Sequence, residues 1–172
     1  MNDTIKTLTS RRSMRQFKKE QLLDSELQEV LQAGMNAPTG GNRQSALMVV
    51  VQDEEMVAKL SAMNAEVLGK TGIDPFYGAP TVVVVLADTR IPTWKEDGSL
   101  VLGNLMNAAY SVGIGSCWIH RAYQVFETEE GKKLLSKWGI PEEYAGVGHC
   151  ILGYPDGDER PISHREDYIR RV

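Results

Sequence analysis

The spacing of apolar residues predicts alternating helices and strands in the first half of the chain. Apolar residues three and four positions apart predict a helix over residues 24–36, with Asp24 as its N-cap. A short, apolar run rich in β-branched residues over 46–52 predicts a buried strand. A second amphipathic helix is predicted after Asp53, and residues 82–87 are predicted to form a second buried strand.

The same pattern continues in the second half. A loop is predicted over residues 89–98, followed by a helix over residues 99–112 whose apolar residues occupy more than one stripe. A helix of that kind is buried on most sides, either within its own domain or against a partner subunit. Residues 114–119 and 146–152 are predicted as strands, with a helix over residues 127–138 between them. Alternating helices and strands indicate the α/β or α+β class.

Length and charge limit the kinds of protein that this chain can be. Its 172 residues contain no repeat or linker, so we expect a single domain over residues 1–172. The net charge of -4 argues against a nucleic acid or an anionic membrane as partner. The first ten residues lack the apolar stretch of a signal peptide, and the apolar run at 82–87 is far too short to span a membrane. We therefore expect a cytoplasmic protein.

Cysteine and histidine spacing excludes several kinds of chemistry. Cys117 and Cys150 both lie in apolar, strand-like sequence, and we expect both to be buried and reduced. No Cys or His spacing indicates a metal site. No Ser-His-Asp or Cys-His arrangement supports hydrolysis, so no catalytic side chain is assigned.

A basic cluster near the N-terminus contrasts with the acidic composition of the whole. Arg11, Arg12 and Arg15 surround Ser13 within five residues. In extended backbone, Arg11, Ser13 and Arg15 point to one side, a face that suits a phosphate dianion. On spacing alone, a basic surface strand fits equally well. A dinucleotide fold is not indicated, because the glycines of residues 113–115 precede a strand and lack the third glycine of that motif.

Four segments, in order, resemble the nitroreductase family of FMN enzymes. They are residues 11–17, residues 37–44, residues 113–119, and residues 153–155 with the basic tail that follows. The resemblance spans nearly the whole chain. It implies an α+β fold with three α-β-α layers, in which helices flank a mostly antiparallel central sheet. It also implies FMN as cofactor, NADH or NADPH as electron donor, and a homodimer with flavin sites at the interface.

The resemblance implies a role for each residue of the basic cluster. Arg11 and Ser13 are expected to hold the flavin phosphate, together with Arg165 from the tail. Arg15 is expected at the pyrimidine edge of the ring, where a fixed cation favours the reduced flavin because that form carries negative charge around N1 and C2=O. Arg12 either contacts the phosphate or faces solvent.

Two later segments complete the expected site. Their candidate cofactor-binding residues are Pro38, Thr39, Gly40, Asn42 and Gln44 in one loop, and Trp118, Ile119, His120 and Arg121 at the end of a strand. In the family the loop packs on the flavin, commonly across the subunit boundary, and the backbone near Ile119 and His120 would face flavin N5. Ser45 and Ala46 stand where the family usually has Pro-Trp. An ordinary turn, a core tryptophan and a surface His-Arg pair are the alternative interpretations.

The sequence thus predicts an FMN-dependent NAD(P)H oxidoreductase. It would reduce small acceptors such as nitroaromatics, quinones or similar electron-poor compounds by ping-pong hydride transfer through flavin N5. Alternatives are a flavin-binding storage or sensor protein without turnover, and flavin breakdown or reductive dehalogenation on the same fold. A domain that binds another phosphorylated small molecule is the remaining alternative.

Overall fold

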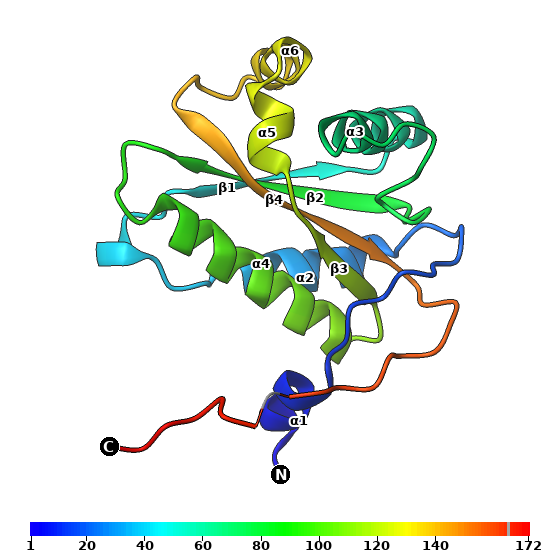
Figure 1. Cartoon of the computed structure of the whole chain (residues 1–172), viewed down its shortest axis with the longest axis vertical. Coiled ribbons are helices and arrows are strands. Elements are labelled where there is room, and N and C mark those ends of the chain that lie inside the picture. The colour runs from blue at the N-terminus through cyan, green and yellow to red at the C-terminus, as the bar shows by residue number, and fades with distance from the viewer. Residues whose placement is uncertain (165) are drawn as a thin grey trace.

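A four-stranded sheet, in the order β1-β2-β4-β3, forms the centre of the computed structural model, which describes residues 1–164 and 166–172 (Figure 1). Every neighbouring pair of strands is antiparallel. The strands are β1 (Ala46–Val51), β2 (Thr81–Asp88), β3 (Gly115–Ile119) and β4 (Tyr144–Gly153). The helices are α1 (Asp3–Ser10), α2 (Asp24–Met35), α3 (Glu54–Val67), α4 (Trp94–Ser111), α5 (Ala122–Glu127) and α6 (Glu129–Lys137), with a 3-10 turn η1 at Gly40–Asn42.

Helices cover both faces of the sheet. Helices α2 and α4 lie on one face, and α3, α5 and α6 lie on the other, while α1 sits beside the C-terminal end of α4 (Figure 1). The predicted three-layer α-β-α arrangement with an antiparallel sheet is therefore confirmed.

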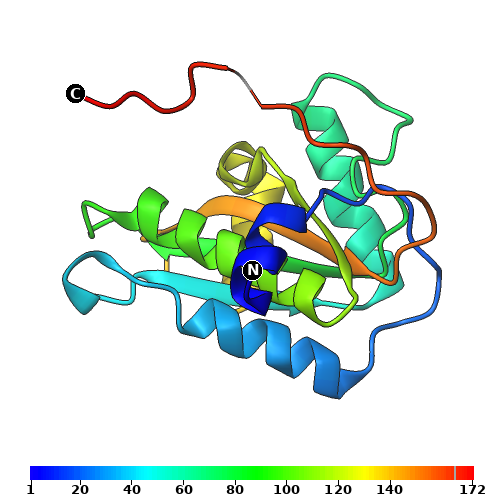
Figure 2. The ribbon, with the colours of Figure 1, turned by 90° about the horizontal axis from the view of Figure 1, so that it is seen from below.

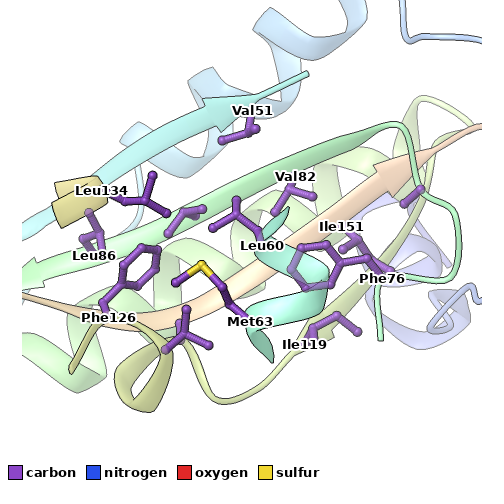
Figure 3. Packing of buried hydrophobic residues seen from close by; sticks show 14 of the residues in the cluster. Val51, Leu60, Met63, Phe76, Val82, Leu86, Ile119, Phe126, Leu134 and Ile151 are labelled. Carbon is purple, nitrogen blue, oxygen red and sulfur yellow. The ribbon is translucent and has the colours of Figure 1, made fainter. Parts of the chain in front are cut away.

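Strand β2 divides the core into two halves. All its residues are buried, because β1 and β4 flank it and helices cover it from both sides. Its side chains alternate, so Val82 and Leu86 join the cluster under α3 and α5, whereas Val83 and Val85 join the one under α4. Figure 3 shows the first cluster, in which Leu60 and Met63 of α3 pack with Phe126 of α5.

Helix α4 begins earlier than predicted. Residues 94–98 are helical rather than part of a loop, so the predicted start at Ser99 is wrong. Gly98 misled the prediction, since glycine is a poor helix former. Here Gly98 is required by packing, because a Cβ at this position would lie 2.6 Å from Cγ2 of Val147.

The region predicted as one helix over residues 127–138 holds parts of two. Thr128 has extended backbone, ends α5 and begins α6, and its hydroxyl accepts the N–H of Gly131. A threonine cap of this kind interrupts a helix while stabilising the start of the next one. Two smaller differences concern the N-terminal region, where α1 was not predicted and Leu23, rather than Asp24, is the N-cap of α2.

The cysteine prediction is confirmed, since Cys117 and Cys150 are both buried and unpaired. Tail residues Tyr168 and Ile169 are exposed. Across the described ranges, no helix is both long and apolar enough to cross a membrane.

A buried histidine lies in the core beside the end of β3. His149 of β4 is fully buried and stacks against Phe76 and Phe126, with ring centroids 5.2 and 6.0 Å away. Its two ring nitrogens have no hydrogen-bond partner within the described part of the chain. Burial lowers the pKa of His149 to about 4, and the charge of nearby Arg121 acts in the same direction, while the backbone of Ile119 and His120, close to the ring but outside hydrogen-bond geometry, acts against both.

We expect His149 to make the protein acid-sensitive. The unfolded chain binds a proton at this residue below a pKa of 6.5, whereas the folded protein does so only below about 4. The free energy of unfolding should therefore fall by roughly 3 kcal/mol as the pH drops from about 6.5 to about 4. Urea unfolding across this range measures the slope, which His149→Leu should flatten and His120→Gln, at an exposed histidine, should leave unchanged. An equal slope in wild type and His149→Leu would contradict the assignment.

Candidate functional site

The arginine-rich segment runs along the outer edge of β3. Ser13 pairs with Ser116 of β3, and the backbone N–H of Met14 donates to the Ser116 carbonyl at 2.8 Å. Further on, the N–H of Lys18 donates to the carbonyl of Tyr154, just past β4. Met14 is buried and packs against Gly115. A Cβ added to Gly115 would lie 2.9 Å from Cγ of Met14. The predicted extended backbone is thus held by the sheet edge.

Two arginines of this segment have no counter-charge among the described residues. The buried Nη1 atom of Arg11 has no hydrogen-bond partner in the described ranges. Arg15 makes no hydrogen bond or ion pair to any described residue, and its guanidinium lies 5.9 Å from the centre of the Tyr77 ring. Cations without a partner in the folded chain are available to an anionic ligand.

Arg12 has a different position. Its Nη1 donates to the carbonyls of Thr9, Ser10 and Arg11, at the C-terminal end of α1. The last carbonyls of a helix lack intrahelical donors and carry partial negative charge, so a cation there is stabilising. The guanidinium of Arg12 therefore caps the C-terminal end of α1. Those of Arg11 and Arg15 have no such partner among the described residues and are available to a ligand.

The turn after β3 is fixed by a buried asparagine. Asn64 of α3 donates from Nδ2 to the carbonyl of His120 at 2.8 Å, and its Oδ1 accepts from Nε and Nη2 of Arg121. Arg121 has a φ of +74°, an uncommon conformation for a residue other than glycine. Asn64 thus holds both the backbone and the one charged side chain of this turn. The sequence analysis missed it, although an amide four residues after Leu60, on an apolar stripe, is a usable signal.

Trp118 and Ile119 lie on opposite faces of the sheet. Ile119 is buried among residues under α3 and α5, while the Trp118 indole packs near Leu102 of α4 and over Gly148. Both side chains contribute to the core clusters, although Trp118 is only partly buried, and the neighbouring His120 is exposed.

The loop before β1 is anchored by a second buried residue that the sequence analysis missed. Asp97 of α4 is 2% exposed, and its carboxylate accepts hydrogen bonds from the N–H of Gly40 and the hydroxyls of Ser45 and Thr93. Burial raises the pKa of Asp97, but these three bonds and the charge of Arg43 outweigh it and hold the pKa below its ordinary value. Ser45 stands where the family usually has proline, which could not donate this bond.

Asn42 and Gln44 are turned outward on this anchored loop. Both are exposed and both have positive φ angles, of 53° and 49°. Their side chains bond each other, and the hydroxyl of Thr39 accepts the N–H of Gln44. Pro38 is also exposed. The loop therefore exposes the side-chain amides of Asn42 and Gln44 on its outer surface.

This loop and the arginine segment lie at opposite ends of the sheet (Figures 1 and 2). The loop leads into Ala46, which faces Ala87 at one end of β2, whereas Ser13 aligns, through β3 and β4, with Thr81 at the other end. At ordinary strand spacings the separation is about 20 Å along β2 and about 19 Å across the sheet. Within one chain, the structure brings the arginine segment close to β3 but leaves the loop far away. Arg165 lies outside the described residues.

Replacing Asp97 by asparagine should loosen the loop. Asparagine keeps one accepting oxygen, so at least one donor among Gly40, Ser45 and Thr93 loses its partner in a buried place, at a cost of about 2 kcal/mol. Urea unfolding measures that loss, and hydrogen exchange at the Gly40 amide should accelerate. The matched control is Glu96→Gln at the neighbouring exposed residue of α4, which removes the same charge. Equal stability of the two variants would contradict the role of Asp97.

Comparison with known proteins places the chain in a family. A family model described as the nitroreductase family matches residues 8–154. A protein of Archaeoglobus fulgidus, provisionally named NADH dehydrogenase/NAD(P)H nitroreductase, is 33% identical over 97% of this chain and 93% of its own length. An NADPH-flavin oxidoreductase of Vibrio harveyi is 31% identical over 91% of this chain and 67% of its own length.

Solved structures agree with this relationship. A nitroreductase with bound FMN from Desulfitobacterium hafniense matches with a TM-score of 0.91 and 28% identity, over 100% of this chain and 99% of that one. A second, from Bacteroides fragilis, has the same fold with a TM-score of 0.92 at 24% identity, over the whole of both chains. The family match covers most of the chain, and the fold agrees throughout. The chain belongs to the nitroreductase family.

Proposed function

We propose that this protein is an FMN-dependent NAD(P)H oxidoreductase that reduces electron-poor acceptors such as nitroaromatics and quinones. The observation that carries the proposal is a pair of arginines along the edge of β3, Arg11 and Arg15, which have no counter-charge among the described residues. Relatives named as an FMN reductase and a flavin oxidoreductase, and FMN bound in a related structure, support the same conclusion.

The described residues fit the phosphate end of FMN. Arg11 has a buried guanidinium nitrogen without a partner, which a phosphate oxygen would satisfy. Ser13 lies two residues further along the same edge and supplies a hydroxyl. Arg165, from the tail, is proposed as the third phosphate ligand from the family resemblance.

The spacing along β3 fits the rest of the cofactor. Ser13 aligns with Ser116, and Ile119 follows three residues later, about 10 Å further along the strand. The five-carbon ribityl chain of FMN covers a span of this size. A phosphate at Ser13 would therefore bring the ring beside the turn of Ile119, His120 and Arg121, which Asn64 holds fixed. The backbone of this turn is proposed to face flavin N5.

FMN, when bound, supplies the hydride chemistry itself, so the residues act by position and charge. Arg15 is proposed to lie at the pyrimidine edge, where its fixed charge stabilises the reduced form more than the oxidised form. No acid, base or nucleophile is assigned among the side chains. With one open site serving donor and acceptor in turn, the expected kinetics are ping-pong.

The distance between the two halves of the site supports a homodimer. One FMN is shorter than the separation between the arginine segment and the loop of Pro38, Gly40, Asn42 and Gln44. We therefore propose that this loop packs on the flavin of a second copy, so that both flavin sites lie at the interface. The exposed apolar residues Ile5 and Leu100 are available to that interface.

The unpaired cysteines support a reducing, cytoplasmic location. We also propose that residues 1–172 act as one domain, because the two core clusters share a single sheet.

The visible spectrum of the purified protein with FMN tests the proposed function. A bound-flavin spectrum should bleach on anaerobic addition of NADH or NADPH and recover when a nitroaromatic or quinone is added. A bound flavin that stays oxidised would indicate a storage or sensor protein instead, and a spectrum of free FMN would reject flavin binding.

Arg11→Ala and Arg15→Ala should have different effects. Losing Arg11 removes a charge-assisted bond to phosphate, so the dissociation constant of FMN should rise about 10- to 100-fold. Losing Arg15 should also lower the flavin midpoint potential, by about 30 mV for each 1.4 kcal/mol of lost preference for the reduced form. Fluorescence titration and potentiometry measure the two effects.

Lys18→Ala is the matched control, because it removes the same charge from an exposed position of the same segment. Equal potentials in Arg15→Ala and Lys18→Ala would reject the role proposed for Arg15.

A further inference from the structure

The turn before β2 is tightly organised around one carboxylate. Asp74 accepts hydrogen bonds from the hydroxyl of Ser61 on α3 and from the backbone N–H groups of Phe76 and Gly78. Phe76 itself is 1% exposed and packs in the core cluster drawn in Figure 3. Asp74 therefore ties the turn to α3 and to its own far end at Gly78, and the buried ring of Phe76 anchors the middle of the turn.

Tyr77 occupies the strained position of this turn. Its φ is +55°, in the left-handed region that bulky residues rarely adopt, and Gly78 beside it has a φ of +69°, which glycine adopts without strain. Its side chain remains 43% exposed, so burial of the ring does not compensate for the strain. Strain of this kind persists only where the surroundings enforce it, and it concentrates at functional sites.

The strained conformation directs the Tyr77 ring at Arg15. The guanidinium carbon of Arg15 lies 5.9 Å from the centre of the ring, within the range of a cation-π interaction. Across the described ranges, this is the one interaction found for the Arg15 side chain, which has no carboxylate partner there. Arg15 comes from the edge of β3 and Tyr77 from the turn before β2, so two separate segments meet at this pair.

An aromatic ring restrains an arginine without neutralising it. A carboxylate in the same place would hold the guanidinium equally well, but it would cancel the positive charge on which a preference for reduced flavin depends. The ring also leaves all the N–H groups of the guanidinium free to donate in the plane of the group.

We propose that Tyr77 is a positioning residue, whose strained ring holds the Arg15 guanidinium in place for the pyrimidine edge of the flavin. This inference rests on the proposed function. It accounts for the strain in the turn, the exposure of the ring and the absence of an acidic partner for Arg15 among the described residues.

Tyr77→Gly separates positioning from packing. Glycine relieves the strain of a positive φ but adds freedom to the unfolded chain, so the two effects offset and the apoprotein should unfold within a few degrees of wild type. The dissociation constant of FMN should nevertheless rise about two- to fivefold, as expected for a lost cation-π contact at an exposed place, and the flavin midpoint potential should fall. Thermal unfolding without FMN, fluorescence titration and potentiometry of the holoprotein give the three values.

Tyr77→Phe is the matched control. It keeps the ring and the strain and removes only the hydroxyl, so its FMN affinity and potential should equal those of wild type. A clear loss of heat stability in Tyr77→Gly, or a wild-type potential in that variant, would overturn the proposal. A lowered potential in Tyr77→Phe would also overturn it, because the hydroxyl and not the ring would then be responsible.

A double-mutant cycle distinguishes this inference from the function on which it rests. If Tyr77 acts through Arg15, then Tyr77→Gly should have no further effect on potential in the Arg15→Ala background. Additive effects would show that Tyr77 acts independently and would overturn the proposal. An Arg15→Ala variant with the wild-type potential would instead reject the role of Arg15 itself, and the role of Tyr77 with it.

Discussion

The hydrogen bond from Met14 N–H to the Ser116 carbonyl is the contact on which the candidate site depends. It adds the arginine segment to the free edge of β3, and the buried side chain of Met14 fixes the register against Gly115. From that register follows the order of groups along the strand. Arg11 and Ser13 come beside its beginning, and the turn held by Asn64 comes at its end.

The buried polar residues and the residues proposed to bind a ligand differ in whether the described chain supplies their partners. Asp97 and Asn64 are buried, and each has its hydrogen bonds filled from within the chain. The backbone of the segment that carries Arg11 and Arg15 is paired with β3, but both side chains lack a counter-charge in the described part of the chain. An anion bound at the proposed site would supply what is missing at the arginines, while the buried polar groups keep the surrounding loops in place.

The fold could be predicted largely from sequence, because each strand and most helices bury an apolar pattern of the right period. The strand around Val84 and the helix around Leu60 are examples. The helix boundaries at Gly98 and Thr128 were predicted wrongly. Gly98 lies inside a helix despite its low helix propensity, because it packs closely on Val147. Thr128 separates two helices, because its hydroxyl caps the second one. Asn64, Asp97 and Tyr77 went unnoticed because their partners lie far away in sequence. Local patterns identify residues suited to a ligand, but only the fold identifies the residues that hold them.

The most direct measurement is amide hydrogen exchange of the protein with and without FMN. If the flavin lies along β3, FMN should slow exchange in residues 11–17 and in residues 118–121, and, in a dimer, in the loop of residues 38–45. Protection confined to segments that the account does not use, such as the groove between α6 and residues 140–144, would contradict the proposed placement of the cofactor.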